Sequence, residues 1–167
     1  SFVVFGKTDG TAVELSAMES GIGGFVVNGV SFFDQSGASV SSAGDVNGDG
    51  FADLIVGAPY DDPNGSSSGA SFVVFGKTDG TAVELSAVEA GTGGFVINGV
   101  SEFDFSGGSV SSAGDVNGDG FSDLIVGADN LIRSFSSTSF VVFGKTDGTA
   151  VELSAIETGT GGFVING

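Results

Sequence analysis

A long internal repeat is the feature that most constrains this chain of 167 residues. The segment SFVVFGKTDGTAVELSA begins three times, at Ser1, Ser71 and Ser139, so that the repeat spacing is 70 residues and then 68. Residues 1–58 and 71–128 differ at only eight aligned positions. Each unit of such an array is one supersecondary element that buries its apolar side against its neighbours. The sequence therefore predicts similar units that stack.

The sequence of each repeat predicts four β-strands. The stretch Asp53–Ala58 is apolar at consecutive positions, as is typical of a strand that is covered on both faces. A loop rich in Gly, Ser and Pro follows it, and Lys77–Thr81 later forms a turn around Asp-Gly. The segment Val83–Ala90 is compatible with a short helical turn. Four strands per unit form the blade of a β-propeller, and we expect them at Ala38–Ser42, Asp53–Ala58, Ser71–Phe75 and Gly94–Asn98.

Two copies of an acidic loop, DVNGDGFAD at residues 45–53 and DVNGDGFSD at residues 115–123, supply candidate metal ligands. Each copy places oxygen side chains at loop positions 1, 3, 5 and 9, and a glycine at position 6 allows the sharp turn. Such a set suits a hard cation, with Ca²⁺ as the default. Without an ion the converging carboxylates repel one another; the alternative is a pair of Asx-rich turns that bind nothing. The candidate side chains are Asp45, Asn47, Asp49 and Asp53, then Asp115, Asn117, Asp119 and Asp123.

An EF-hand does not fit this loop. That motif needs a bidentate Glu at position 12 and a helix on each side. Position 12 here is Val56 or Val126, inside the short β-branched run DLIVGA, which indicates a strand. The sequence therefore predicts a calcium loop that joins two strands.

Three stretches of the repeat resemble the FG-GAP repeat. They are Ser36–Val40, the run GDVNGDGFADLIVGAP at Gly44–Pro59, and SFVVFG at Ser71–Gly76. The resemblance extends over nearly the whole chain, and the loop pattern D-x-[DN]-x-D-G-x-x-D is matched in full twice. It implies the propeller of integrin α subunits and many bacterial surface proteins, with calcium bound between the first two strands of a blade.

The resemblance also implies which atoms bind the ion. The side chains named above carry over directly, and the backbone carbonyl at loop position 7 joins them. Two departures from the family pattern stand out: Ser36 and Ser106 replace the aromatic of the FG pair, and Asp129 replaces the proline of the second GAP. The implied carbonyl ligands are those of Phe51 and Phe121.

The blade count predicts an all-β chain of about two and a half four-stranded antiparallel blades. We expect residues 1–30 to supply the last two strands of a partial blade, and residues 31–100 and 101–167 to form two FG-GAP blades. A closed propeller needs at least four blades, so the chain is expected to belong to a larger propeller, surface array or fibre, made with further copies of the repeat in the same chain or by self-assembly. An array or fibre is favoured over a closed symmetric ring because the two repeats differ in their inter-strand loop and because Glu102 stands at the repeat position of Phe32. The start at Ser1 without Met suggests a processed or excised piece.

The composition limits the kinds of molecule that the chain can bind and the kinds of active site that it can build. The formal net charge is −17, and two bound calcium ions would leave about −13. Such a surface excludes nucleic acid and anionic lipid as partners. No apolar stretch is long enough to insert in a membrane. Cys and His are both absent, so no thiolate nucleophile and no imidazole base can be built.

These observations predict a non-enzymatic, extracellular or cell-surface calcium-binding module with a structural or adhesive role. The alternative is a carbohydrate-binding module, or the accessory propeller of a secreted carbohydrate-active enzyme, although Tyr60 is the only Tyr and Trp is absent. An enzyme could use paired carboxylates, and Glu14, Glu84 and Glu152 recur in one register. Their recurrence in every unit favours a structural role, because an active site is normally unique.

Glycosylation and one inter-unit contact are further predictions. Asn64-Gly65-Ser66 matches an N-glycosylation sequon, although an ordinary Asn-Gly turn has the same sequence. The hydroxyl-rich stretches Ser66–Ser68 and Ser136–Ser139 are candidates for O-linked glycans or flexible linkers. Arg133, the only arginine, is a candidate for pairing with a neighbouring unit.

Overall fold

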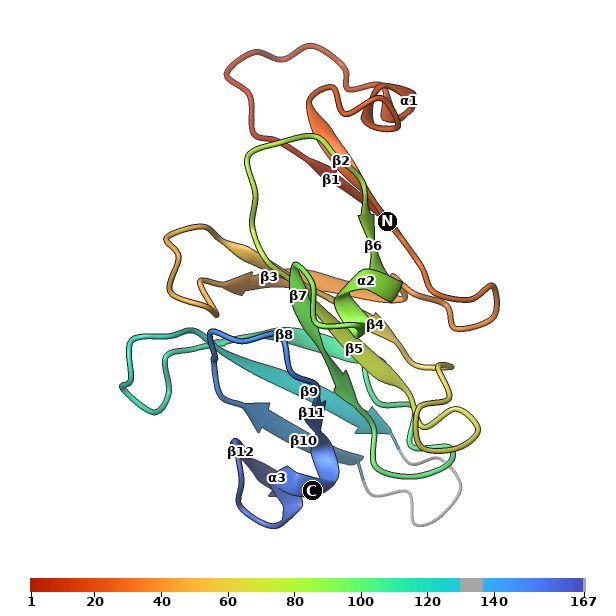
Figure 1. The fold of residues 1–167 in the computed structure, drawn as a ribbon, viewed down its shortest axis with the longest axis vertical. Helices are drawn as coiled ribbons and strands as arrows, with labels where there is room; N and C mark the ends of the chain where they lie inside the picture. Colours follow the sequence, from red (N-terminus) through yellow and green to blue (C-terminus); the bar gives the residue numbers. More distant parts are fainter. Residues whose placement is uncertain (130–136, 167) are drawn as a thin grey trace.

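The computed structural model describes residues 1–129 and 137–166. In these residues the chain forms twelve strands in three mostly antiparallel sheets, with three short helices. The sheets follow one another from the N-terminal to the C-terminal end of the molecule (Figure 1). The prediction of an all-β fold of incomplete propeller blades is confirmed.

The middle sheet contains one complete blade. Its four strands pair antiparallel in chain order, and the register places Ile55 opposite both Ser41 and Val73. Each predicted strand of this period is present, with ends shifted by at most two residues. The strands are β3 (Ser39–Gly44), β4 (Asp53–Ala58), β5 (Ala70–Val74) and β7 (Gly94–Asn98).

The last sheet repeats this arrangement, and the first sheet holds only half of it. In the first sheet two antiparallel strands stand where the middle blade has β5 and β7. The strands of the last sheet are β8 (Ser109–Gly114), β9 (Asp123–Asp129), β10 (Ser137–Val142) and β12 (Gly162–Asn166), and those of the first are β1 (Phe2–Val4) and β2 (Gly24–Asn28).

Two very short strands, which were not predicted from the sequence, connect neighbouring sheets. β6 (Val83–Glu84) pairs in parallel with β2, and β11 (Val151–Glu152) pairs in parallel with β7. The helical turn expected from Val83 therefore starts only after a strand. The pairing partner lies in the preceding repeat, so local sequence gives no sign of it. The helices themselves are α1 (Leu15–Met18), α2 (Leu85–Glu89) and α3 (Leu153–Glu157).

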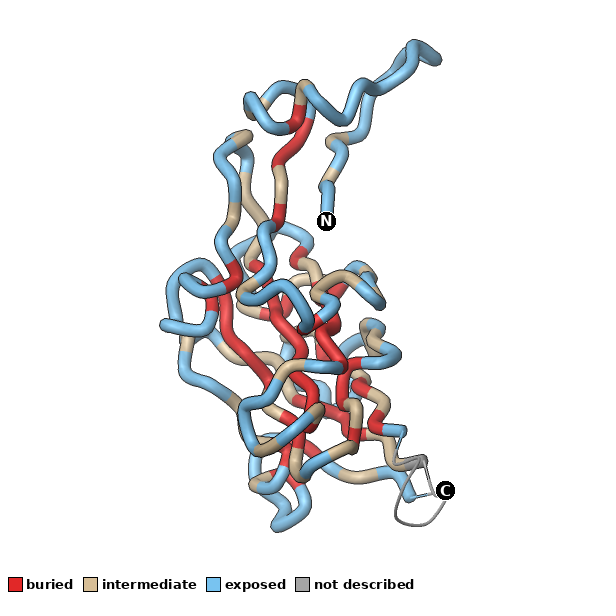
Figure 2. Tube along the Cα trace, turned by 90° about the vertical axis from the view of Figure 1, so that its right-hand side faces the viewer, coloured by how far each residue is buried: buried red, intermediate tan, exposed pale blue. Residues whose placement is uncertain are grey.

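The apolar cores lie between consecutive sheets. Ile55 of β4 packs into the core shared with the last sheet, while the next residue, Val56, packs into the core shared with the first. This confirms that β4 is covered on both faces. At Gly57 the backbone of the following unit comes close to β4, because a Cβ atom there would lie 2.0 Å from the Gly107 carbonyl oxygen. Buried residues accordingly concentrate in the middle of the molecule, and the N-terminal half-blade is mostly exposed (Figure 2).

Candidate functional site

Both acidic loops project from the same side of the molecule, between the first two strands of each complete blade (Figure 1). The first loop joins β3 to β4 and the second joins β8 to β9. Their surroundings differ. The first loop contacts the last blade: the Asp45 carbonyl oxygen accepts a hydrogen bond of 2.8 Å from the Ser122 N–H, and Val46 is fully buried. Val116, the equivalent residue of the second loop, is 49% exposed.

The first aspartate of each loop holds the turn in place. The Asp45 carboxylate accepts hydrogen bonds from the N–H groups of Gly48 at 2.7 Å, Asp49 at 3.1 Å and Gly50 at 3.0 Å. Gly50 adopts a φ of 89°, a conformation that favours glycine. Asp115 makes the same three bonds with the same lengths in the second loop. The two loops are therefore folded alike.

The residues at positions 3 and 5 contact each other. The Asn47 side-chain oxygen accepts the Asp49 N–H at 2.9 Å, and the Asn47 amide nitrogen donates to the Asp49 carboxylate at 2.9 Å. The other oxygen of Asp49 accepts the Phe51 N–H at 2.8 Å. Asn117 and Asp119 repeat these contacts. Positions 1, 3 and 5 are thus brought together in one exposed turn.

The aspartate at position 9 lies at the buried base of each loop. Both Asp53 oxygens accept backbone hydrogen bonds, from the N–H of Val46 at 2.8 Å and of Gly76 at 2.7 Å. Burial raises the pKa of Asp53, against these two hydrogen bonds, which lower it. Asp123 is equally buried and accepts from Val116 and Gly144. The aspartate at position 9 therefore attaches the loop to the sheet, a role that was not predicted from the sequence.

The donor chemistry of the loops fits a hard cation, although the side chains do not enclose one. Among residues 1–129 and 137–166, no group of three or more carboxylates is arranged around a common point where a metal could sit. All candidate side chains nevertheless carry oxygen. The three lysines are held in turns of their own, at Lys7, Lys77 and Lys145, so none of them neutralises the loops. Arg133 lies outside the described residues. Three carboxylates per loop thus remain without a positive partner in the described part of the chain.

Two of the three recurring glutamates, Glu84 and Glu152, bind asparagines of the preceding unit. The Asn28 amide donates to Glu84 at 2.7 Å, and the Asn98 amide donates to Glu152 at 2.7 Å. Repetition of both residue types in every unit was the available sequence signal, but only the glutamates were singled out. In this arrangement Glu84 and Glu152 join neighbouring sheets.

The Asn64 side-chain nitrogen, the atom to which an N-glycan would be attached, is engaged in two hydrogen bonds. It donates to the Gly99 carbonyl at 2.9 Å and to Glu152 at 3.0 Å. Attachment of a glycan would cost at least one of these bonds. In the first serine-rich stretch Ser68 is fully buried and Ser66 is exposed. Part of the second stretch lies outside the described residues.

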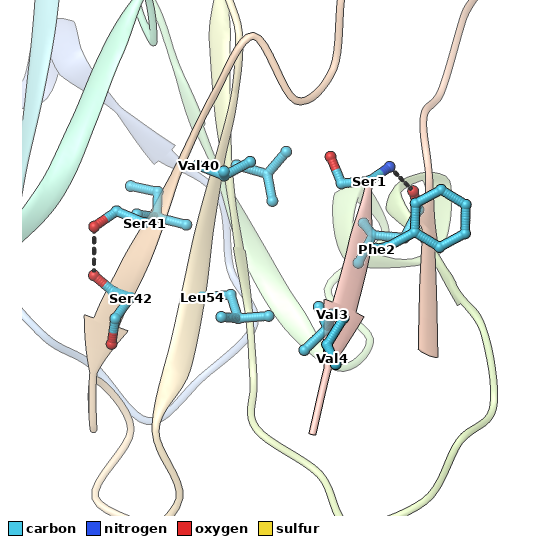
Figure 3. A pocket seen from close by; sticks show the side chains of 11 residues that line it. Ser1, Phe2, Val3, Val4, Val40, Ser41, Ser42 and Leu54 are labelled. Atoms are coloured by element: carbon cyan, nitrogen blue, oxygen red, sulfur yellow. Dashed lines mark hydrogen bonds between the residues drawn. The ribbon is translucent and has the colours of Figure 1, made fainter. Parts of the chain in front are cut away.

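A cavity of about 350 Å³ opens between the half-blade and the middle blade. β1 forms one wall, and β3 and β4 form the other (Figure 3). Its lining is apolar apart from Ser1, Ser41 and Ser42 and contains no acidic side chain. In the middle blade the strand equivalent to β1 is β5, and the edge of β5 on this side pairs with β4. The cavity therefore marks the place of the inner strands that the half-blade does not contain.

Comparison with known proteins agrees with this geometry. The FG-GAP repeat family matches residues 36–74 and 106–150, which together make half of the chain. The chain belongs to the FG-GAP repeat family. The two matches begin just before β3 and β8, so they contain both acidic loops and the strands around them.

Relatives of the FG-GAP repeats in this chain include integrin α subunits. The chain is 36% identical to integrin alpha-PS5 of Drosophila melanogaster over 96 residues and 38% identical to integrin alpha-3 of Cricetulus griseus over 97 residues. It is 31% identical to integrin alpha-IIb of Mus musculus over 108 residues. The alignments cover 55%, 56% and 62% of this chain, but only 8% or 9% of each relative. The chain thus spans less than a tenth of these proteins.

No helix in the described residues has the length and apolar character needed to cross a lipid bilayer.

Proposed function

We propose that this chain is an extracellular or cell-surface calcium-binding repeat module with a structural or adhesive role. The observation that carries the proposal is the pair of identically folded acidic loops, each with three carboxylates and no positive partner among the described residues. The family and its integrin α relatives support the same function. We infer no enzymatic activity, because Glu84 and Glu152, two of the three recurring glutamates, bind asparagines and join neighbouring units.

One Ca²⁺ per loop would use the side chains at positions 1, 3, 5 and 9 and the carbonyl at position 7. Bound calcium would supply the positive charge that the loop lacks, and so relieve carboxylate repulsion. The chain itself shapes the loop: Asp45 bonds three N–H groups and Asp53 fastens the loop base. Affinity on the order of 10⁻⁴ to 10⁻³ M is typical of extracellular modules. The ligands in this proposal are Asp45, Asn47, Asp49, Phe51, Asp53, Asp115, Asn117, Asp119, Phe121 and Asp123.

Melting curves in calcium and in chelator test the proposal. Occupancy at 100-fold above Kd stabilises a fold by about 2.7 kcal/mol per site, so chelator should lower the Tm by several degrees. Asp49→Ala and Asp119→Ala should each remove part of this shift. Glu157→Ala is the matched control, because it removes one exposed carboxylate away from both loops and should keep the full shift. Identical melting curves with and without calcium would contradict the proposal.

The partners that we propose are further copies of the repeat. We propose that the repeat divides the chain into units at 1–30, 31–100 and 101–167, with such a partner beside the first and the last of them. An extracellular protein or a glycan is the alternative ligand, and binding to a glycan array would support it.

A further inference from the structure

The two junctions between consecutive sheets share one set of contacts. In each junction a lysine from the later unit covers a phenylalanine of the earlier one. The Lys77 ammonium lies 4.9 Å from the centre of the Phe25 ring, and the Lys145 ammonium lies 4.9 Å from that of Phe95. A cation over an aromatic face is attracted by the ring's quadrupole. The buried rings are therefore held from the neighbouring unit.

A two-residue parallel strand pair forms the second contact. Val83–Glu84 pairs with Val27–Asn28, and Val151–Glu152 pairs with Ile97–Asn98. The asparagine-to-glutamate hydrogen bonds described above end each pair. The strand pair and its terminal hydrogen bond fix the register of one unit against the next.

A close approach of two glycines is the third contact. A Cβ atom on Gly80 would lie 2.0 Å from the Gly21 carbonyl oxygen, and one on Gly148 would lie 2.1 Å from that of Gly91. No side chain fits between these backbones. The same pairs of residue types thus meet at both junctions.

The N-terminal unit carries an unused copy of the later half of this junction. Lys7, Gly10, Val13 and Glu14 stand at the repeat positions of Lys77, Gly80, Val83 and Glu84. A Cβ atom on Gly10 would meet nothing within 4 Å. No described aromatic ring lies under Lys7, and no described side chain bonds Glu14. We call this set the head face.

The C-terminal unit carries an unused copy of the earlier half. Gly159, Phe163, Ile165 and Asn166 stand at the repeat positions of Gly91, Phe95, Ile97 and Asn98. Phe163 and Ile165 are 44% and 46% exposed, whereas their counterparts in the middle blade are fully buried. The space beside Gly159 is open, and the Asn166 amide has no partner among the described residues. We call this set the tail face.

We propose that the head face of one copy binds the tail face of another, so that copies join head to tail through the contacts used twice inside the chain. Lys7 then covers Phe163 of the preceding copy, Val13–Glu14 pairs with Ile165–Asn166 of that copy, and Gly10 meets its Gly159. Apolar side chains beside the head face, Phe2, Val4 and Leu15, become covered at the same time. A contact between two different faces propagates unless the rotation closes a ring. This inference rests on the assembly role proposed above and names its interface.

Charge opposes the association, and so fixes the conditions of the test. Each copy carries a formal charge of −17, so copies repel one another over distances that salt shortens to about 8 Å at 0.15 M. Sedimentation velocity of the whole 167-residue chain should therefore be measured at this ionic strength with excess calcium. The expected result is a concentration-dependent series of dimers and larger species.

Two substitutions test the pairing of Glu14 with Asn166. Glu14→Lys removes the acceptor on the head face, and Asn166→Asp places a carboxylate opposite Glu14 from the tail face. Each should weaken association by roughly tenfold or more, the equivalent of about 1.4 kcal/mol. The double variant brings an introduced lysine against an introduced carboxylate and should restore association. Rescue of this kind is not expected of two unrelated surface changes.

Asn98→Asp is the matched control, because it makes the same change opposite Glu152 at an internal junction. It should lower the Tm and leave association unchanged. A wild-type chain that stays monomeric over a 100-fold range of protein concentration, up to its solubility limit, would overturn the inference. Single variants that associate as wild type, or a double variant that is not restored, would also overturn it. Calcium dependence of the Tm is measured separately, so failure of the interface is distinguishable from failure of calcium binding.

Discussion

One sequence occurs in two environments in this chain. The segment SFVVF begins β1 of the half-blade and recurs in β5 of the middle blade. Phe2 and Val4 are 44% and 45% exposed, whereas the identical residues Phe72 and Val74 are fully buried. Leu15 and Leu85 differ in the same way. Because the sequences are the same, the difference comes from the neighbouring unit: the middle blade has a neighbour on both faces, and the half-blade on only one.

The largest expected effect of this difference is on core truncations. Phe72→Ala should destabilise the fold by about 3–5 kcal/mol, because it leaves a cavity in a core closed on both sides. Phe2→Ala should cost only about 1–2 kcal/mol in the monomer, since Phe2 is already 44% exposed to water. Urea denaturation of the two variants measures both values. Equal losses would show that the exposure of β1 does not reflect its state in solution.

A smaller effect is expected from the glutamates that join the units. Glu84→Ala removes the acceptor of the Asn28 amide and should cost about 1.5 kcal/mol, the lower end for a hydrogen bond to a charged group. Glu14→Ala has no such bond to lose among the described residues and should be neutral in the monomer. Chemical denaturation at low protein concentration compares the two. A cost for Glu14→Ala equal to that for Glu84→Ala would contradict the assignment of this contact to the junction.

The smallest effect concerns Asp61, which lies in the loop that joins β4 to β5 and has acidic residues near it. Burial, with the nearby charges of Asp34, Glu89 and Asp62, raises the pKa of Asp61 from 3.8 to about 6. The folded chain therefore binds this proton more tightly than the unfolded chain, and stability falls as pH rises from about 4 to about 6. Asp61→Asn removes the cost and should stabilise the fold at pH 7 by about 1 kcal/mol, after allowance for partial exposure.

The advantage of Asp61→Asn over wild type should disappear below about pH 4, where Asp61 is protonated in both states. Denaturation curves at pH 4, 5.5 and 7 follow it. If the Asp61→Asn variant is only as stable as wild type at pH 7, the ionised Asp61 carboxylate does not destabilise the fold.

The strands and loops within each unit could be predicted from the sequence because their signals are local. The apolar run of Asp53–Ala58 and the glycine at loop position 6 lie inside one repeat, and the structure has β4 and the turn there. The half-blade was predicted because residues 1–30 contain only the last two of the four strands that are expected in each repeat. The bond from the Gly76 N–H that fixes Asp53 was missed, because Gly76 lies beyond the next strand.

Contacts between units could not be predicted in the same way. β6 and β11 are two residues long, and their partners lie in the preceding repeat, so no periodicity marks them. The repeat shows which residue types recur, such as those of Asn98 and Glu152. It does not show which residues of one unit contact which residues of the next. The sequence likewise predicts the calcium ligands by type, while the Asn47 amide contact with Asp49 depends on how the turn closes.

We propose that each acidic loop binds one calcium ion, and the number of bound ions can be counted. Native mass spectrometry of the whole chain in calcium, with magnesium as the competing ion, should show two bound ions in wild type. Asp49→Ala and Asp119→Ala should each show one, and the double variant none. A wild-type chain that carries no calcium at millimolar calcium would overturn the proposal of two calcium sites, and so would a count that neither substitution changes.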